Sequence, residues 1–240
     1  MKNFKLLIVI VILSITSITL GILYFSQKYG SKEIVTNLEA VDESDYLFSN
    51  EYFESLPKEE LSEDETDGLL LIHEEEKLAH DVYTKLYEIW GQNIFLNISD
   101  SEQTHTDMVK DLLDKYELAD PADRQAIGDF TNPDLANLYT QLTEKGSNSL
   151  VDALIVGATV EDLDIKDLKD LIAQTDNEDI LAVYQNLQKG SRNHLRSFTN
   201  VLNRNGEIYT PQYITQAEYD NIIGTPSENG VTYNSNGEQI

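Results

Sequence analysis

Four stretches between residues 62 and 203 share one apolar rhythm, and this rhythm predicts four helices. In each stretch apolar residues recur at alternating steps of three and four, which places them on one helix face. Every stripe is interrupted near its middle by polar residues, which are Glu76 in the first, Glu102 and His105 in the second, Glu161 and Asp164 in the third, and Ser191 and His194 in the fourth.

These polar interruptions need a common cause, because burying several unpaired carboxylates is strongly unfavourable. No Lys or Arg occupies these stripe positions to neutralise them. A pair of divalent metal ions would do so. The sequence therefore predicts that the four helices meet around a dimetal site.

The helix ends support this division of the chain. Ser62 and Glu65 form a capping-box pattern before the first stripe, and Gly91 is a plausible stop after it. Thr175 and Glu178 suggest a second capping box before the fourth stripe.

The lengths of the connections predict the topology. The first and second helices are joined tightly around Gly91, and the third and fourth around Asp176. About thirty residues, including a short helix near Pro133 to Glu144, separate the second helix from the third. An antiparallel pair, a long crossover and a second antiparallel pair predict an all-α, ferritin-like four-helix bundle.

In bundles of this class a di-iron site takes one Glu from each of two helices and Glu-x-x-His from each of the other two. Glu102 and His105 match one Glu-x-x-His pair, since a spacing of three places both on one face. Glu76 and Glu161 lie in phase with that pair on other helices, and His194 lies in phase on the fourth. An incidental polar pair is the alternative interpretation of Glu102 and His105, and a buried histidine that donates to a carbonyl is the alternative for His194.

Several segments together resemble a known ferritin-like family, domain of unknown function 2202. They are "EEEKLAHDVYTKLYEIWG", "NISDSEQTHTDMVKDLLDKY", "SLVDALIVGATVEDLDIKDL", "GSRNHLRSF" and "PQYIT". The resemblance covers about residues 60–222, and the first helix is similar to the first ligand helix of rubrerythrins. It implies metal ligands at Glu76, Glu102, His105, Glu161 and His194. Where the pattern requires a Glu on the fourth helix this chain has Ser191, and Asp164 could supply the missing oxygen ligand. The alternative interpretation of Asp164 is an exposed acidic turn, in which case one metal position would be weaker or the site would hold a single ion.

The resemblance implies a carboxylate-bridged pair of iron ions, with manganese as the alternative. The expected chemistry is oxidation of ferrous iron by oxygen or peroxide, of ferroxidase or peroxidase type. The competing interpretation is a non-catalytic, extracytoplasmic module that binds metal or serves a structural or interaction role, and Ser191 is its best support. A homodimer is compatible with either function.

Outside the bundle the chain predicts a membrane anchor. Residues 6–25 are uncharged and long enough to span a bilayer, and Lys2 and Lys5 precede them. A single-pass membrane protein with an extracytoplasmic domain is expected, with secretion after signal cleavage as the alternative. The predicted divisions are an anchor at 1–29, an acidic linker at 30–61, the bundle at 62–203, a packed extension at 204–222 and a flexible tail at 223–240.

Composition excludes several classes of function. The net charge of −26 argues against binding nucleic acid through a basic surface. The absence of cysteine excludes disulfides, cysteine nucleophiles and cysteine-ligated iron.

Residues beside the first and third stripes receive plainer interpretations. Glu74 and Glu75 lie off the first stripe and are expected on a solvated face. His73 and His80 are expected at the surface, and the alternative is that they hydrogen-bond to the metal ligands. Gly157 could leave room for a small oxidant or allow close helix packing.

Overall fold

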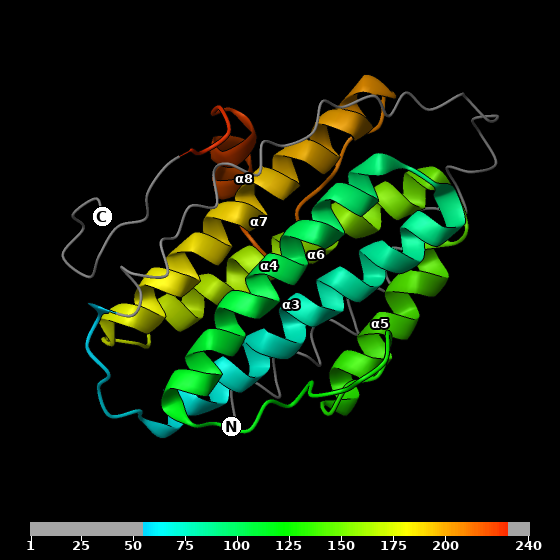
Figure 1. Ribbon diagram of the computed structural model, residues 1–240. Helices are drawn as coiled ribbons and strands as arrows, with labels where there is room; N and C mark the ends of the chain where they lie inside the picture. Colours follow the sequence, from blue (N-terminus) through cyan, green and yellow to red (C-terminus); the bar gives the residue numbers. More distant parts are fainter. Residues whose placement is uncertain (1–54, 230–240) are drawn as a thin grey trace. The chain divides into compact units, whose positions relative to one another are not determined.

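A computed structural model describes residues 55–229 of the 240-residue chain (Figure 1). Within this range all regular secondary structure is helical, which confirms the predicted all-α class. The helices are α3 (Glu63–Trp90), α4 (Asn93–Tyr116), α5 (Pro133–Gly146), α6 (Leu150–Ile172), α7 (Glu178–Arg204) and α8 (Gln216–Ile223).

The ends of α3 are set by local chemistry that the sequence predicted. Ser62 Oγ accepts a hydrogen bond from the Glu65 backbone N–H, and the Glu65 carboxylate accepts one from the Ser62 backbone N–H. The helix ends at Gly91, whose φ of 62° is a left-handed conformation that glycine adopts easily. Helix α4 begins two residues later, so the predicted tight connection is confirmed.

The start of α7 differs from the prediction. Its N-cap is Asn177, which makes no side-chain cap bond, so the capping box expected from Thr175 and Glu178 is wrong. Thr175 instead donates to Glu65 Oε1 at 2.7 Å and accepts from the Asn177 N–H at 3.2 Å. The hydroxyl therefore ties the α6–α7 connection to the start of α3 rather than capping α7.

The four long helices pack as a bundle of two hairpins. Helix α3 packs along α4 and α6 packs along α7, while α3–α6 and α4–α7 contacts join the hairpins. The apolar stripes fill the space between them with side chains such as Leu69, Tyr83, Phe95 and Phe198, all fully buried. Helix α5 lies against α3 and α6, as Figure 1 shows. A helical bundle is therefore confirmed.

The chain after α7 is fastened to the bundle by one buried carboxylate. Asp162 of α6 accepts hydrogen bonds from the backbone N–H groups of Gln212, Tyr213 and Ile214 and from the Tyr209 hydroxyl. These bonds place α8 next to α7, where Arg196 donates to the Ile222 carbonyl at 2.8 Å. The extension thereby covers part of the bundle without taking part in its polar centre.

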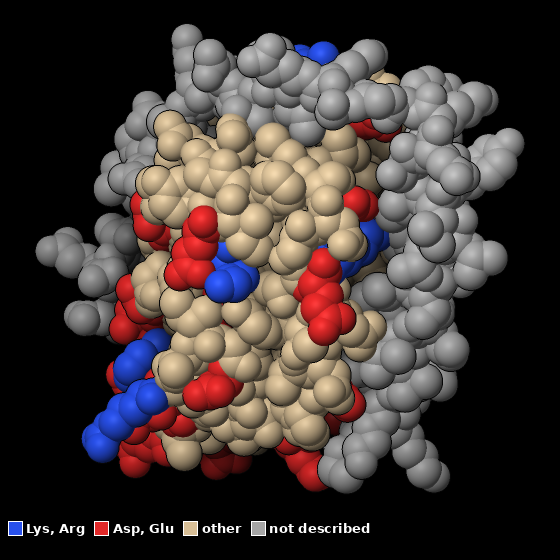
Figure 2. Space-filling model, turned by 90° about the vertical axis from the view of Figure 1, so that its right-hand side faces the viewer, with Lys and Arg blue, Asp and Glu red and all other residues tan. Residues whose placement is uncertain are grey.

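The surface drawn in Figure 2 carries several separate acidic side chains. Several Lys and Arg side chains on that face lie beside acidic ones. Among residues 55–229, none of the helices combines the length and apolar character needed to cross a bilayer. The anchor predicted at residues 6–25 lies outside the described part of the chain.

Candidate metal centre

The polar residues that interrupt the four stripes meet at one level of the bundle. Glu76 comes from α3, Glu102 and His105 from α4, Glu161 from α6 and His194 from α7. Each of these five residues is at most 2% exposed. The sequence spacing placed them on inward faces, and packing of the two hairpins brings those faces together.

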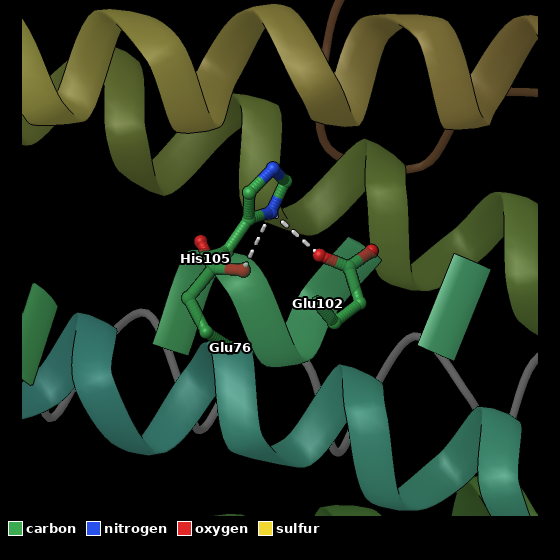
Figure 3. Close-up of side chains that lie close together, drawn as sticks. All are labelled: Glu76, Glu102 and His105. Carbon is green, nitrogen blue, oxygen red and sulfur yellow. Dashed lines mark hydrogen bonds and ion pairs between the residues drawn. The ribbon is translucent and has the colours of Figure 1, made fainter. Parts of the chain in front are cut away.

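The α3–α4 half of the centre is a compact group of three side chains (Figure 3). His105 Nδ1 lies 2.6 Å from Glu102 Oε2, one turn away on the same helix, and 3.2 Å from Glu76 Oε2 across the hairpin. Potential ligand atoms from the three residues all lie within 4.8 Å of one another. Two carboxylates and one imidazole could therefore hold one ion here.

The α6–α7 half repeats this donor set around a shared carboxylate. His194 Nδ1 lies 2.8 Å from Glu102 Oε1 and 3.4 Å from Glu161 Oε2. Donor atoms of Glu102, Glu161 and His194 again lie within 4.8 Å of one another. Glu102 belongs to both groups and presents one oxygen to each, which is the arrangement required of a bridging ligand.

Hydrogen bonds outside the two groups orient their members. The other ring nitrogen of His194, Nε2, lies 3.1 Å from Ser101 Oγ, which leaves Nδ1 directed at the carboxylates. The Tyr83 hydroxyl lies within hydrogen-bond distance of Glu161 Oε1 and 3.2 Å from the Gly157 carbonyl oxygen. The second half is thus held from both α3 and α4.

Asp164 lies next to the position that departs from the expected motif. Ser191 Oγ is within hydrogen-bond distance of Asp164 Oδ2 and lies 2.9 Å from the Leu187 carbonyl oxygen. Asp164 also lines a cavity with Glu76, Glu102 and Glu161. The structure therefore places its carboxylate beside the centre, while Ser191 contributes only a neutral hydroxyl.

Burial and the charges of neighbouring side chains strongly shift the pKa values of the carboxyl groups in this centre. Burial raises the pKa of Glu76 and of Glu161 to about 7, and the Glu102 carboxylate adds to both shifts. Burial would also raise the Glu102 pKa, but His194 and His105 outweigh it and lower that pKa well below its usual range. Burial raises the Asp164 pKa well above normal, and the Glu76 charge raises it further.

The donor chemistry fits a metal pair. Glu76 Oε1 is buried and has no hydrogen-bond partner among residues 55–229, although carboxylate oxygens buried in proteins are normally satisfied. The centre contains carboxylate oxygens and two imidazoles, a set that can bind divalent metal ions. Two divalent cations would balance the four carboxylates of Glu76, Glu102, Glu161 and Asp164.

Comparison with known proteins finds one family whose range includes all of these residues. Residues 65–226 match the family described as "Uncharacterized protein domain (DUF2202)". The chain belongs to this family. It is also 56% identical to the uncharacterized protein MJ0754 of Methanocaldococcus jannaschii over 181 residues, or 75% of this chain and 98% of that protein.

The fold agrees with a solved relative of the DUF2202 domain. The crystal structure of hypothetical protein MJ0754 from Methanococcus jannaschii matches with a TM-score of 0.71 and 57% sequence identity. The match covers 72% of this chain and 99% of that one.

Several residues of the DUF2202 domain were misplaced by sequence reasoning. Glu74 and Glu75 are buried, at 4% and 8% exposed, rather than on a solvated face. Glu74 accepts hydrogen bonds from the backbone N–H groups of Thr131 and Asn132, so the α4–α5 connection covers it. The apolar spacing within α3 could not predict this burial, because the residues that cover Glu74 belong to another segment of the chain.

The histidines beside Glu76 show the same effect. His73 is 1% exposed, and its Nε2 lies 2.9 Å from Asp120 Oδ1, so the predicted surface position is wrong. His80 is half-buried and pairs with Asp81. Both histidines pair with carboxylates outside the two groups and are not brought into the centre.

The residues around Gly157 distinguish between its two interpretations. A Cβ atom at this position would lie 2.4 Å from Cε1 of Phe198, too close for any real contact. Gly157 therefore allows α6 and α7 to pack closely, and the Phe198 ring occupies the space that an oxidant would need.

Proposed function

We propose that this protein is a ferritin-like dimetal carboxylate protein, with iron as the preferred metal and manganese as the alternative. The observation that carries the proposal is the double role of Glu102, whose two oxygens face two separate histidine-containing groups. The arrangement of two helical hairpins joined by a long connection supports the same class.

The chain's own residues account for binding and positioning. Glu76 and His105 would hold one ion, Glu161 and His194 the other, and Glu102 would bridge them. Asp164 would supply the oxygen that Ser191 cannot. Because carboxylates must be ionised to bind cations, metal binding would displace the protons that burial keeps on Glu76 and Glu161.

Two bound ferrous ions would together supply the two electrons that, with two protons, reduce one hydrogen peroxide molecule to two water molecules. The protein's contribution is to limit access, since the five central residues are almost fully buried. The cavity between α3 and α6 reaches Glu76, Glu102 and Glu161 and would admit only a small oxidant. Oxygen or peroxide is therefore the proposed substrate class.

Placement at the membrane is part of the same proposal and rests on the sequence. The uncharged segment at 6–25 would anchor the chain, with the bundle outside the cytoplasm. A homodimer is compatible with this arrangement.

Elemental analysis of the purified full-length chain tests the proposal. The expected result is at least two iron or manganese ions per chain, two of which depend on Glu102, followed by peroxide consumption when the ferrous protein is mixed with peroxide. Two ions without peroxide or oxygen consumption would leave a metal-binding protein and remove the redox reaction. A chain that binds neither metal after exposure to both would support the alternative, a structural or interaction module.

A further inference from the structure

A second pair of buried acidic residues lies beside the proposed dimetal centre. Glu75 of α3 and Asp167 of α6 are 8% and 3% exposed. Glu75 Oε2 and Asp167 Oδ1 have no hydrogen-bond partner within the described chain, residues 55–229. Neither residue is needed to explain the two groups around Glu102.

The packing of α3 against α6 places these two side chains at neighbouring levels of the two helices. The contacts of Gly68 with Leu171 and of Tyr83 with Gly157 show that the helices run antiparallel. Side chains tilt toward the start of their own helix, so Glu75 leans toward the level of Asp167. Asp167 leans toward Glu75 in turn.

Electrostatic effects agree with this convergence. Burial raises the Glu75 pKa well above its usual range, and the nearby Asp167 and Glu76 carboxylates raise it further. Lys166 is the cation that acts on Asp167, but its Nζ pairs with Asp170. The charged groups that act on Glu75 are therefore all acidic.

A third oxygen atom lies at the same seam. The Tyr184 hydroxyl is 3.4 Å from the place where a Cβ on Gly68 would lie. It has no hydrogen-bond partner in the described chain, and Glu75 is among the carboxylates that raise its pKa. Glu75 itself lines the cavity that reaches Glu76 and Glu161, so the seam is open to the same small solutes.

We propose that Glu75 and Asp167 bind a third divalent cation, next to the dimetal pair and separate from it. Its ligands are oxygens alone, which suits hard cations such as Mn²⁺ or Mg²⁺ better than metals that prefer imidazole. One divalent ion neutralises the two carboxylates that the dimetal pair leaves uncompensated. The inference depends on the proposed function only in taking that pair as its neighbour.

The test counts Mn²⁺ ions on metal-free full-length protein by equilibrium dialysis and elemental analysis. Wild type is expected to bind three ions, and Glu75→Gln and Asp167→Asn two each. The matched control is Glu74→Gln, which alters an adjacent buried carboxylate that already has backbone donors and should still bind three. Two ions on wild type, or three on both variants, would overturn the proposal.

The dimetal proposal and this one fail in distinguishable ways. Glu102→Gln should remove the pair and leave one ion, and that ion should disappear when Glu75→Gln is added. A wild-type chain that binds one ion, lost in Glu75→Gln alone, would contradict the dimetal centre and keep this site. Two ions on wild type with a raised Tm in metal-free Glu75→Gln would show instead a carboxyl pair that shares a proton.

A crystallographic measurement avoids variants that fail to fold. Crystals of wild type soaked in Mn²⁺ should show an anomalous peak within ligand distance, about 2.0–2.3 Å, of carboxylate oxygens from Glu75 and Asp167. Peaks confined to the Glu102 groups would overturn the third site.

Discussion

The two halves of the candidate centre are built from the same residue types but are completed differently. In the α3–α4 half, Glu102 and His105 form an intact Glu-x-x-His pair, and Glu76 faces them across the hairpin. In the α6–α7 half, His194 is preceded by Ser191 where the pattern expects Glu, and the extra carboxylate, Asp164, comes from the opposite helix.

Under the proposed function, Asp164 of α6 would supply the oxygen ligand that the motif on α7 lacks. Asp164 places a carboxyl group within hydrogen-bond distance of Ser191. The total number of carboxylates around the pair is therefore the same as in a centre with two intact motifs. The asymmetry predicts that the two halves respond differently to substitution.

Replacing the shared ligand should have the largest effect. Glu102→Gln removes the one carboxylate that faces both histidines, so both ions of the pair should be lost. The loss of affinity should exceed the ~10–100-fold caused by removing an outer hydrogen-bond partner. Elemental analysis after dialysis measures it, with Glu88→Gln at an exposed position of the neighbouring helix α3 as control. Retention of both ions would remove Glu102 from the bridge.

Lower pH should weaken both halves together. The pKa values of Glu76 and Glu161 are raised to about 7, so both groups are protonated below pH 7 and must ionise to bind metal. Affinity should fall by about tenfold per pH unit for each proton released, as measured by competition with a chelator. Affinity that does not change between pH 8 and pH 6 would contradict this.

The same raised pKa values make the metal-free protein less stable at higher pH, which is opposite to their effect on metal affinity. A carboxyl whose folded pKa is raised stabilises the fold below its unfolded pKa, and this contribution is lost as pH rises through about 7. The Tm of the metal-free chain should therefore fall between pH 5 and pH 8, while bound metal should reverse the trend.

Asp164→Asn should weaken metal binding in the α6–α7 half and not in the α3–α4 half. With Ser191 neutral, the substitution leaves the α6–α7 side one carboxylate short, so one of the pair's two ions should be lost. Asp170→Asn, at a more exposed position of the same helix, is the control. Two ions retained at undiminished affinity would exclude Asp164 as a ligand.

Moving the carboxylate back to α7 should restore the pair. The double variant Asp164→Asn with Ser191→Glu recreates Glu-x-x-His with His194 and should again bind two ions. Ser191→Glu alone adds a like charge beside Asp164 and should lower the Tm of the metal-free chain. A double variant that stays at one ion would show that α7 cannot present a ligand at this position.

The smallest effect is expected from the hydroxyl that orients Glu161. Tyr83→Phe removes this donor and should weaken the α6–α7 ion by ~10-fold while leaving the α3–α4 ion unchanged. Tyr116→Phe removes a buried hydroxyl that bonds Asp179 far from the centre and serves as control. Equal weakening of both ions would assign Tyr83 a general structural role.

The apolar spacing in the sequence predicted which polar side chains point into the bundle. Alternating steps of three and four fix which side chains share a helix face, so Glu76, Glu102, His105, Glu161 and His194 could be assigned to one inward level. The long connection between α4 and α6, compared with the short ones around Gly91 and Asp176, also fixed the order of the two hairpins.

Only the tertiary structure determined whether the residues beside those helix faces are buried or exposed. Periodicity describes one helix at a time, whereas burial of Glu74 depends on the α4–α5 connection and burial of Glu75 on the approach of α6. The hydrogen bond between Ser191 and Asp164 likewise joins two helices, and the periodicity of either helix alone does not predict it. A residue beside the stripe is polar in either case, and what packs against it determines whether it meets water or another carboxylate.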